Sequence, residues 1–242
     1  MTKRRTVPRE FGGGEPTSYR GKRPKTFESE RKPEPIHPKT QAQSEYLAAL
    51  RSSDQVVVLG PAGTGKTFLA GTHAADQLRT KRRSKVVITR PNVPGGRSIG
   101  FFPGTLEEKI APWVLPLTEV MKERMGTGAF EIALKNGDVE IVPFEVMRGR
   151  TFKDAVVILD EAQNTLPGEI KMFLTRIGED AQVIINGDVS QTDLRETSGL
   201  RTAIHLIKSL HLPIPVIEFT KDDIVRSGIC AMWVDAFDTA RI

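Results

Sequence analysis

At 242 residues, the chain is long enough for one domain with a tail, or for two small domains at most. Its hydrophobic content of 38% supports a packed core, but no apolar run approaches the roughly 18 residues that a membrane-spanning helix needs. A single cysteine, Cys230, excludes an intrachain disulfide, and the charged N-terminus lacks the apolar stretch of a secretory signal, so a soluble cytoplasmic protein is expected.

Residues 1–38 are rich in Pro, Gly, Lys, Arg and Glu and poor in large apolar side chains. Such a segment buries too little surface to offset the entropy of ordering, which predicts a disordered tail ahead of a folded domain over residues 39–242. The net charge is +5, and residues 1–40 carry 11 Lys and Arg against 5 Asp and Glu, so the tail is basic. It suits a polyanion such as RNA, DNA or an acidic partner, and a merely solubilising role is equally compatible with its sequence.

From residue 40 onward, helical and strand patterns alternate along the chain. Short apolar runs, typical of fully buried parallel strands, are found at 56–59, 86–88, 139–142, 156–159, 183–185 and 216–219. Helical patterns are found at 41–50, 65–79, 106–123, 169–177, 203–210 and from 222 onward, with Pro112 and Pro116 interrupting the third. The alternation predicts an α/β fold: a mostly parallel sheet with helices on both faces.

The most specific motif lies between the first predicted strand and the helix that follows it. Residues 60–67 fit the pattern G-x-x-x-x-G-K-[ST] in full. Glycines let the backbone curl so that successive N–H groups face phosphate oxygens, and the dipole of the following helix favours the anion. The predicted phosphate-binding residues are Gly60, Pro61, Ala62, Gly63, Thr64, Gly65, Lys66 and Thr67. Lys66 is expected to reach the β- and γ-phosphates of a nucleotide, and Thr67 to place its hydroxyl on Mg²⁺.

Two carboxylates, Asp160 and Glu161, follow the apolar strand predicted at 156–159. Ligands of parallel sheets bind at the carboxyl ends of the strands, so both side chains are expected beside the phosphate loop. Asp160 is predicted to hold Mg²⁺, and Glu161 to act as general base on the attacking water. An exposed turn pair is the alternative, which the apolar strand disfavours.

The strand predicted at 183–185 also ends in polar residues, among them Asp188 and Gln191. At the same edge of the sheet, Gln191 is expected to hydrogen-bond the γ-phosphate, and Asp188 to order the lysine or the water. An ordinary turn is the alternative, because Gly-Asp is common in turns.

Seven strings occur in order along the chain: GPAGTGKT at 60–67, TRP at 89–91, GFFPG at 100–104, MRGRTF at 147–152, ILDEAQNT at 158–165, KMFLTRIG at 171–178 and GDVSQTDL at 187–194. Together they resemble the PhoH-like ATPases, over residues from about 40 to 230. That family is similar to one RecA-like half of a superfamily 1 helicase. The resemblance implies a P-loop NTPase of RecA-like fold that uses ATP and Mg²⁺.

The resemblance also implies roles for residues outside these two motifs. Gln43 stands where a helicase-type Q motif recognises the adenine edge, with Tyr46 nearby, and a solvated helix face is the alternative for Gln43. Arg90 corresponds to a motif that faces nucleic acid or the nucleotide in related helicases. Arg226 matches the family's late arginine, although Ser227 stands where many members have a histidine.

Helicases of this group bind ATP between two RecA-like domains, and the second domain supplies an arginine to the γ-phosphate. This chain is too short for a second such domain, so the arginine must come from the same domain or from a neighbouring subunit. The resemblance supports a hexameric ring, with Arg176 and Arg226 as candidate arginine fingers. Arg148 and Arg150 are further candidates for phosphate or RNA contact, and a structural ion pair is the alternative for each arginine.

Residues 91–138 form a long insert between two predicted strands, and inserts of that length usually carry function. The insert is expected to line a central pore or to pack between subunits. Phe101, Phe102 and Trp113 are candidates to stack on bases, with plain packing as the alternative for Trp113.

These features favour a ring-shaped ATPase stimulated by single-stranded RNA or DNA. One alternative is an ATP-driven molecular switch or assembly factor without translocation. A kinase acting on a small molecule is disfavoured, because the adjacent Asp160 and Glu161 suit water as the acceptor and because such kinases usually lack an element like that of Gln191.

Overall fold

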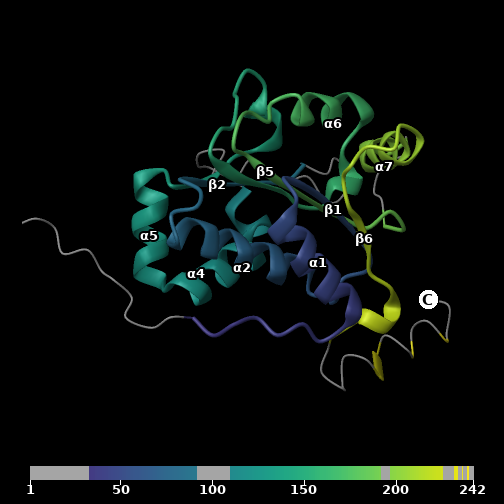
Figure 1. Cartoon of the computed structure of the whole chain (residues 1–242), viewed down its shortest axis with the longest axis horizontal. Helices are drawn as coiled ribbons and strands as arrows, with labels where there is room; N and C mark the ends of the chain where they lie inside the picture. The colour runs from purple at the N-terminus through teal and green to yellow at the C-terminus, as the bar shows by residue number, and fades with distance from the viewer. Residues whose placement is uncertain are drawn as a thin grey trace, which may run out of the picture.

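We describe the chain from a computed structural model, which places residues 33–91, 110–191 and 197–225, and four further residues at 232, 233, 236 and 239. Six strands form one sheet in the order β3-β2-β4-β5-β1-β6, and every ladder is parallel (Figure 1). The strands are β1 (Gln55–Leu59), β2 (Lys85–Thr89), β3 (Val139–Ile141), β4 (Ala155–Leu159), β5 (Gln182–Gly187) and β6 (Val216–Glu218). The predicted α/β fold is confirmed.

Helices cover both faces of the sheet (Figure 1). One face carries α1 (Gln41–Ser52), α2 (Lys66–Arg79), α4 (Leu115–Met125) and α5 (Thr127–Asn136). The other face carries α6 (Pro167–Leu174) and α7 (Gly199–Ser209). Each face has its own apolar cluster: Val56 and Val58 of β1 point into the first, whereas Val57 and Leu59 point into the second. Burial on both faces explains why the strands are continuous apolar runs without a polar alternation.

The order of the strands places β5 between β1 and β4. In register, Leu59 of β1 pairs with Gly187 of β5, and Leu159 of β4 pairs with Ile185. The carboxyl ends of these three strands therefore lie at one edge of the sheet, and the loops that follow them meet there.

Local chemistry explains where several helices begin. Thr40 caps α1 by accepting a hydrogen bond from the N–H of Gln43 at 3.3 Å, and Ser198 caps α7 in the same way through the N–H of Leu200 at 3.2 Å. Pro116 lies at the start of α4, where its missing N–H removes no helical hydrogen bond. The helix predicted at 106–123 is thus broken: Ala111–Trp113 form a short 3₁₀ helix, η1, and α4 starts at Leu115.

The structure differs from the sequence analysis at two further helices. The sequence did not predict α5, which lies inside the long insert. The helix predicted from residue 222 is wrong over its first residues: Lys221–Asp223 form a single 3₁₀ turn, η4, and Ile224 is extended. Two further 3₁₀ helices, η2 (Phe144–Met147) and η3 (Ala162–Asn164), precede and follow β4.

The last residues of the predicted tail contact the domain. Ile36 packs against the apolar cluster beneath α1 and α2, and the Glu34 carbonyl accepts a hydrogen bond from Arg124 at 2.5 Å. Residues 1–32 lie outside the described part of the chain, so the prediction of a disordered tail there stays a prediction. Among the described helices, none combines the length and apolar character that crossing a bilayer requires.

Candidate functional site

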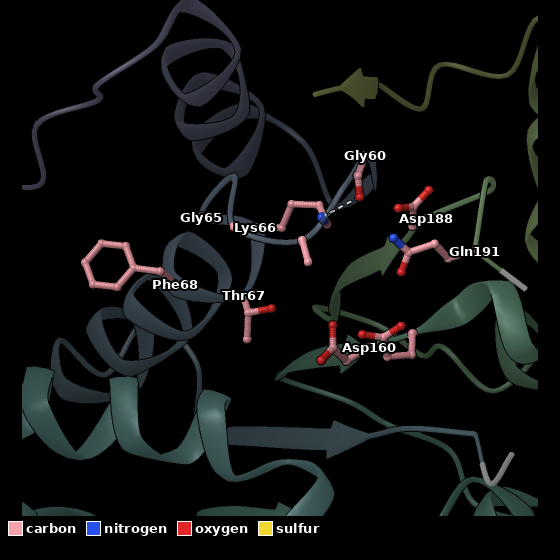
Figure 2. A pocket seen from close by; sticks show the side chains of 12 residues that line it. Gly60, Gly65, Lys66, Thr67, Phe68, Asp160, Asp188 and Gln191 are labelled. Carbon is pink, nitrogen blue, oxygen red and sulfur yellow. Dashed lines mark hydrogen bonds between the residues drawn. The ribbon is translucent and has the colours of Figure 1, made fainter. Parts of the chain in front are cut away.

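A pocket of about 260 Å³ lies at the carboxyl edge of the sheet, where the segments that follow β1, β4 and β5 meet (Figure 2). It is lined by Gly60, Ala62, Gly63, Gly65, Lys66, Thr67, Phe68, Asp160, Glu161, Gly187, Asp188 and Gln191. The predicted phosphate loop, the predicted acid pair and the predicted third element therefore share one cavity, although more than a hundred residues separate the first from the last.

The shape of the phosphate loop depends on its glycines. Gly60 has φ +132°, and a Cβ there would lie 2.4 Å from the backbone oxygen of Phe219, at the end of β6. Gly65 has φ +89° and leads directly into α2 at Lys66. Only glycine adopts such angles readily at a point of close backbone approach, so the loop is shaped for a ligand at the start of α2.

Lys66 is held inside the curl of the loop. Its ammonium donates a hydrogen bond to the carbonyl of Gly60 at 2.6 Å (Figure 2) and another to the carbonyl of Pro61 at 2.7 Å. Burial lowers the pKa of Lys66, and the negative charges of Asp188, Asp160 and Glu161 act in the opposite direction. Carboxylates from two other strands thus act electrostatically on the loop lysine.

Asp160 is a partly buried acid in the wall of the pocket. Burial, together with the neighbouring charge of Glu161, raises the pKa of Asp160 to about 6, whereas Arg90 and Lys66 oppose the rise. Its carboxylate and the hydroxyl of Thr67 face the same space (Figure 2). A buried carboxylate that repels its neighbour is stabilised by a cation, so this position suits a metal ion.

Glu161 adopts an uncommon backbone conformation, with φ 54° and ψ 40°. A non-glycine residue in the left-handed region costs about 1–3 kcal/mol, and such strain occurs preferentially at functional sites. The carboxylate accepts a hydrogen bond from the amide of Gln163 at 2.5 Å. The backbone and this hydrogen bond together fix the direction of the Glu161 side chain.

Gln163 is a site residue that sequence reasoning missed. Its side chain is buried, and its amide oxygen accepts a hydrogen bond from the N–H of Asp188 at 3.0 Å. One side chain therefore joins the acid pair after β4 to the end of β5. Gly187 is needed for this approach, because a Cβ there would lie 2.9 Å from the amide oxygen of Gln163. The available signal was the position of Gln163 in the same string as Asp160 and Glu161.

Asp188 and Gln191 occupy the third side of the pocket. One carboxylate oxygen of Asp188 accepts hydrogen bonds from the N–H of Ser190 at 2.9 Å and from its hydroxyl at 2.6 Å. The other oxygen is buried and has no hydrogen-bond partner among the described residues. Gln191 is exposed at the rim, next to Asp188 (Figure 2). A buried unpaired carboxylate oxygen is costly unless a donor or cation reaches it.

Gln43 lies outside this lining. It is buried, which rules out the solvated helix face. Its amide nitrogen donates to the Thr64 carbonyl at 3.0 Å, and its amide oxygen accepts from the Lys39 N–H at 2.8 Å. Tyr46 packs nearby as predicted, fully buried against the edge of Phe219.

Arg176 does not belong to the described lining of the pocket. Its carbonyl accepts a hydrogen bond from the N–H of Phe152 at 2.9 Å, and Ile177 bridges to the same residue. These residues precede β4 and β5, so Arg176 lies toward the edge of the sheet opposite to the pocket. Arg226 lies outside the described residues, as do Phe101 and Phe102.

The three other candidate arginines have different surroundings. Arg150 forms an ion pair with Glu140, which also pairs with Lys85 at 2.5 Å, so the structural alternative is correct for Arg150. Arg148 is exposed. Arg90 donates to the carbonyl of Trp113 at 3.0 Å, and its guanidinium lies 5.4 Å from the centre of that ring.

The lining fits a divalent cation shared with a triphosphate. No group of three or more His, Cys, Asp or Glu side chains within the described ranges could hold a metal alone. A magnesium ion would therefore need phosphate oxygens in addition to Thr67 and Asp160, as Mg²⁺ does in many nucleotide sites. The unpaired oxygen of Asp188 and the raised pKa of Asp160 both favour positive charge in this space.

The chain is similar in sequence to one family of known proteins. The model of the family described as "PhoH-like protein" matches residues 35–238. A PhoH-like protein of Bacillus subtilis (strain 168) is 45% identical over 205 residues, which cover 84% of this chain and 64% of that protein. Protein PhoH of Escherichia coli (strain K12) is 41% identical over 207 residues, 84% of this chain and 58% of that protein.

A solved structure, of the Pif1 helicase from Candida albicans, aligns with 85% of this chain and 44% of its own, with a TM-score of 0.44 and 19% identity. The chain spans about three fifths of the length of the curated relatives it matches. The match of the family model over most of the folded residues, together with these identities, shows that the chain belongs to the PhoH-like family.

Proposed function

We propose that the pocket binds ATP with Mg²⁺ and hydrolyses the bond to the γ-phosphate. The observation that carries the proposal is the meeting of Lys66 with Asp160 and Glu161 in one cavity. A phosphate loop alone binds anions, and an acid pair alone binds cations. Together, at the carboxyl edge of a parallel sheet, they suit the transfer of a phosphoryl group to water.

Each side chain has a separate task in this proposal. The N–H groups of the loop and the ammonium of Lys66 bind phosphate oxygens, while Thr67 and Asp160 hold Mg²⁺, which neutralises charge on those oxygens. Glu161 orients the attacking water and accepts its proton. The amide of Gln163 keeps the Glu161 carboxylate in place, because it hydrogen-bonds to it and to the end of β5.

Gln191 is proposed to bond to the γ-phosphate, because it stands exposed at the rim beside Asp188. Gln191 belongs to the segment that follows β5. Movement of this segment on loss of the phosphate would therefore change the hydrogen bond from the Asp188 N–H to Gln163. The chain thus has a path by which the state of the nucleotide reaches the acid pair.

The test of this function is ATP binding and turnover in Lys66→Ala. We expect turnover to fall by at least about a hundredfold, because the substitution removes the positive charge that faces three carboxylates and the phosphates. Lys135→Ala, an exposed lysine on α5, is the matched control and is expected to keep wild-type turnover. Normal turnover in Lys66→Ala would place the ATPase site elsewhere.

We further propose that the chain works as a ring, in which a neighbouring subunit completes each site. Support comes from Arg176, whose backbone pairs with Phe152 toward the edge of the sheet opposite to its own pocket, so this arginine does not complete the site of its own chain. The mass of the protein in solution, with and without ATP, tests this directly. A monomer in both conditions would leave Arg176 without a target.

Stimulation by single-stranded RNA or DNA is the activity we favour for such a ring. Trp113 is 46% exposed and lies against Arg90, and the charge of Arg90 acts on Asp160. A base stacked on Trp113 would therefore contact a side chain that is linked electrostatically, through Arg90, to the ATP site. ATP turnover with and without each polymer separates this activity from the alternative, an ATP-driven switch without translocation. Unchanged turnover with both polymers would favour the switch.

A further inference from the structure

We propose that the nucleotide site recognises the base by stacking it on Phe68, with no side chain of the described lining placed to hydrogen-bond the base edge, and therefore accepts GTP about as well as ATP. The inference rests on the proposed function, since it assumes that the triphosphate lies in the phosphate loop. The inference concerns the nucleoside, which is the part of the substrate that the phosphate loop and the acid pair do not contact.

Phe68 is placed to meet the nucleoside. It follows Thr67 in the first turn of α2, lines the pocket and is 47% exposed. Figure 2 shows its ring beyond Lys66 and Thr67, on the side away from Asp160 and Asp188. Because the acids and Lys66 define the end of the pocket that takes the γ-phosphate, the nucleoside must extend toward the other end, where the ring lies.

The exposure of Phe68 has no explanation in the packing of α2. The next apolar residues of this helix, Leu69 and Ala70, are buried in the core beneath the sheet. An aromatic ring left in solvent at the mouth of a phosphate site is a surface on which a base can stack, and stacking tolerates any base because each has a π-face.

Gln43 was the residue expected to recognise the adenine edge, and its hydrogen bonds oppose that role. Its amide joins the Thr64 carbonyl to the Lys39 N–H, at 3.0 and 2.8 Å. Turning it toward a base would leave both backbone groups without these bonds. Gln43 also lies 3.0 Å from the position that a Cβ on Gly65 would take. These contacts make Gln43 a positioning residue for the phosphate loop.

The remaining polar side chains of the described lining face the phosphate end. They are Lys66, Thr67, Asp160, Glu161, Asp188 and Gln191. Discrimination between adenine and guanine by factors of thousands needs buried donors and acceptors matched to the base edge. With a ring face as the contact to the base, the site distinguishes nucleotides from inorganic triphosphate but discriminates little between the two purines.

The experiment measures, by calorimetry with Mg²⁺ present, the binding of ATP, GTP and inorganic triphosphate to the full chain. We expect wild-type protein to bind ATP and GTP within about threefold of each other. Phe68→Leu, which keeps apolar volume but loses the ring, should weaken both nucleotides by roughly tenfold and leave triphosphate unchanged. Phe68→Tyr should retain nucleotide binding. The control is Leu210→Ala, which changes another exposed apolar residue, at the C-terminal end of α7. This variant should bind all three compounds as the wild-type protein does.

Gln43→Leu separates the two roles of Gln43. If Gln43 positions the phosphate loop, the variant should bind ATP, GTP and triphosphate more weakly to the same degree, because the loop itself is disturbed. If Gln43 recognises adenine, only the binding of ATP should weaken. If this variant does not fold, as judged by its thermal transition, the Phe68 variants still test whether the base stacks on the ring.

Two results would overturn the inference while leaving the proposed function intact: a preference for ATP over GTP of more than about a hundredfold, or unchanged nucleotide binding in Phe68→Leu. Failure of the wild-type protein to bind any of the three compounds would instead refute the proposed function.

Discussion

At the scale of single residues, the pocket combines groups that are unfavourable in the absence of a ligand. Asp160 is partly desolvated beside another carboxylate, Glu161 is held in the left-handed region, and one oxygen of Asp188 has no partner within the described chain. Each arrangement costs stability and makes sense where positive charge and phosphate are to be bound. These three residues all line the pocket.

Asp160→Asn is therefore expected to stabilise the protein in the absence of nucleotide and metal. Burial raises the pKa of Asp160 to about 6, so the ionised form destabilises the folded state above that pH, and the effect is relieved as the pH falls through 6 toward the unfolded value. At pH 8 the variant should gain about 1–3 kcal/mol in free energy of unfolding, measured by denaturant titration. It should also lose Mg²⁺-dependent ATP turnover. A destabilised variant would contradict this account of Asp160.

Sequence patterns identified residues of the pocket lining because these residues are close in sequence or lie at strand ends, and the roles assigned to them stay predictions. Gly60, Lys66 and Asp160 were identified from local patterns, and the parallel sheet brought them together. Gln163 was missed because its importance depends on a hydrogen bond to the backbone of Asp188, 25 residues away. No local pattern encodes which N–H a buried amide will reach.

At the scale of elements, continuous apolar runs predicted all six strands, because a strand buried on both faces has almost no polar positions. The sequence did not predict α5 because its apolar residues do not form one stripe. Phe130 and Ala133 are buried, whereas Ile132 and Leu134 are exposed on the same helix. The order of the strands, in contrast, was not predicted from the sequence.

One polar contact links three elements of the described fold. His73 of α2 hydrogen-bonds the amide oxygen of Gln182 at 2.6 Å, and the amide nitrogen of Gln182 donates to the carbonyls of Leu50 and Ser53 at 2.8 Å. Gln182 begins β5, and the two carbonyls lie at the end of α1. The contact ties the amino end of β5 to the helices on one face of the sheet.

This contact predicts a loss of stability in mild acid. Burial lowers the pKa of His73, with its hydrogen bond to the amide oxygen of Gln182 opposing the shift, so the unfolded chain takes up the proton first. The stabilisation is complete above the unfolded value of about 6.5 and is lost as the pH falls below it, by at most about 1.4 kcal/mol per pH unit. Comparison with His73→Gln at pH 7.5 and 5.5 isolates this residue from Asp160, which titrates in both proteins. An equal change in both proteins would mean that His73 makes no contribution.

At the scale of the whole molecule, charge is divided between two parts. Residues 1–40 carry a surplus of basic residues, with 11 Lys and Arg against 5 Asp and Glu, whereas the rest of the chain is nearly neutral. The boundary between the parts lies before Ile36, which packs on the domain, and the family match begins at residue 35. The surplus of basic charge available to a polyanion therefore lies in the segment before the domain.

Deleting residues 1–32 tests this division, because the deletion spares the contacts of Glu34 and Ile36. We expect an unchanged thermal transition and unchanged ATP turnover without nucleic acid. Binding to single-stranded RNA should weaken, and its dependence on salt concentration should become shallower, since fewer cations neutralise phosphates. A lower thermal transition would show instead that the segment stabilises the domain.

The most direct measurement of the central claim is the fate of ATP bound to Glu161→Gln. If Lys66 and Glu161 act on one nucleotide, this variant keeps the loop and the metal-holding residues but lacks the base, so it should retain ATP with its γ-phosphate intact through rapid gel filtration. The wild-type protein should release ADP under the same conditions. Hydrolysis by Glu161→Gln at the wild-type rate would contradict the account, because the acid pair and the phosphate loop would then not form one catalytic site.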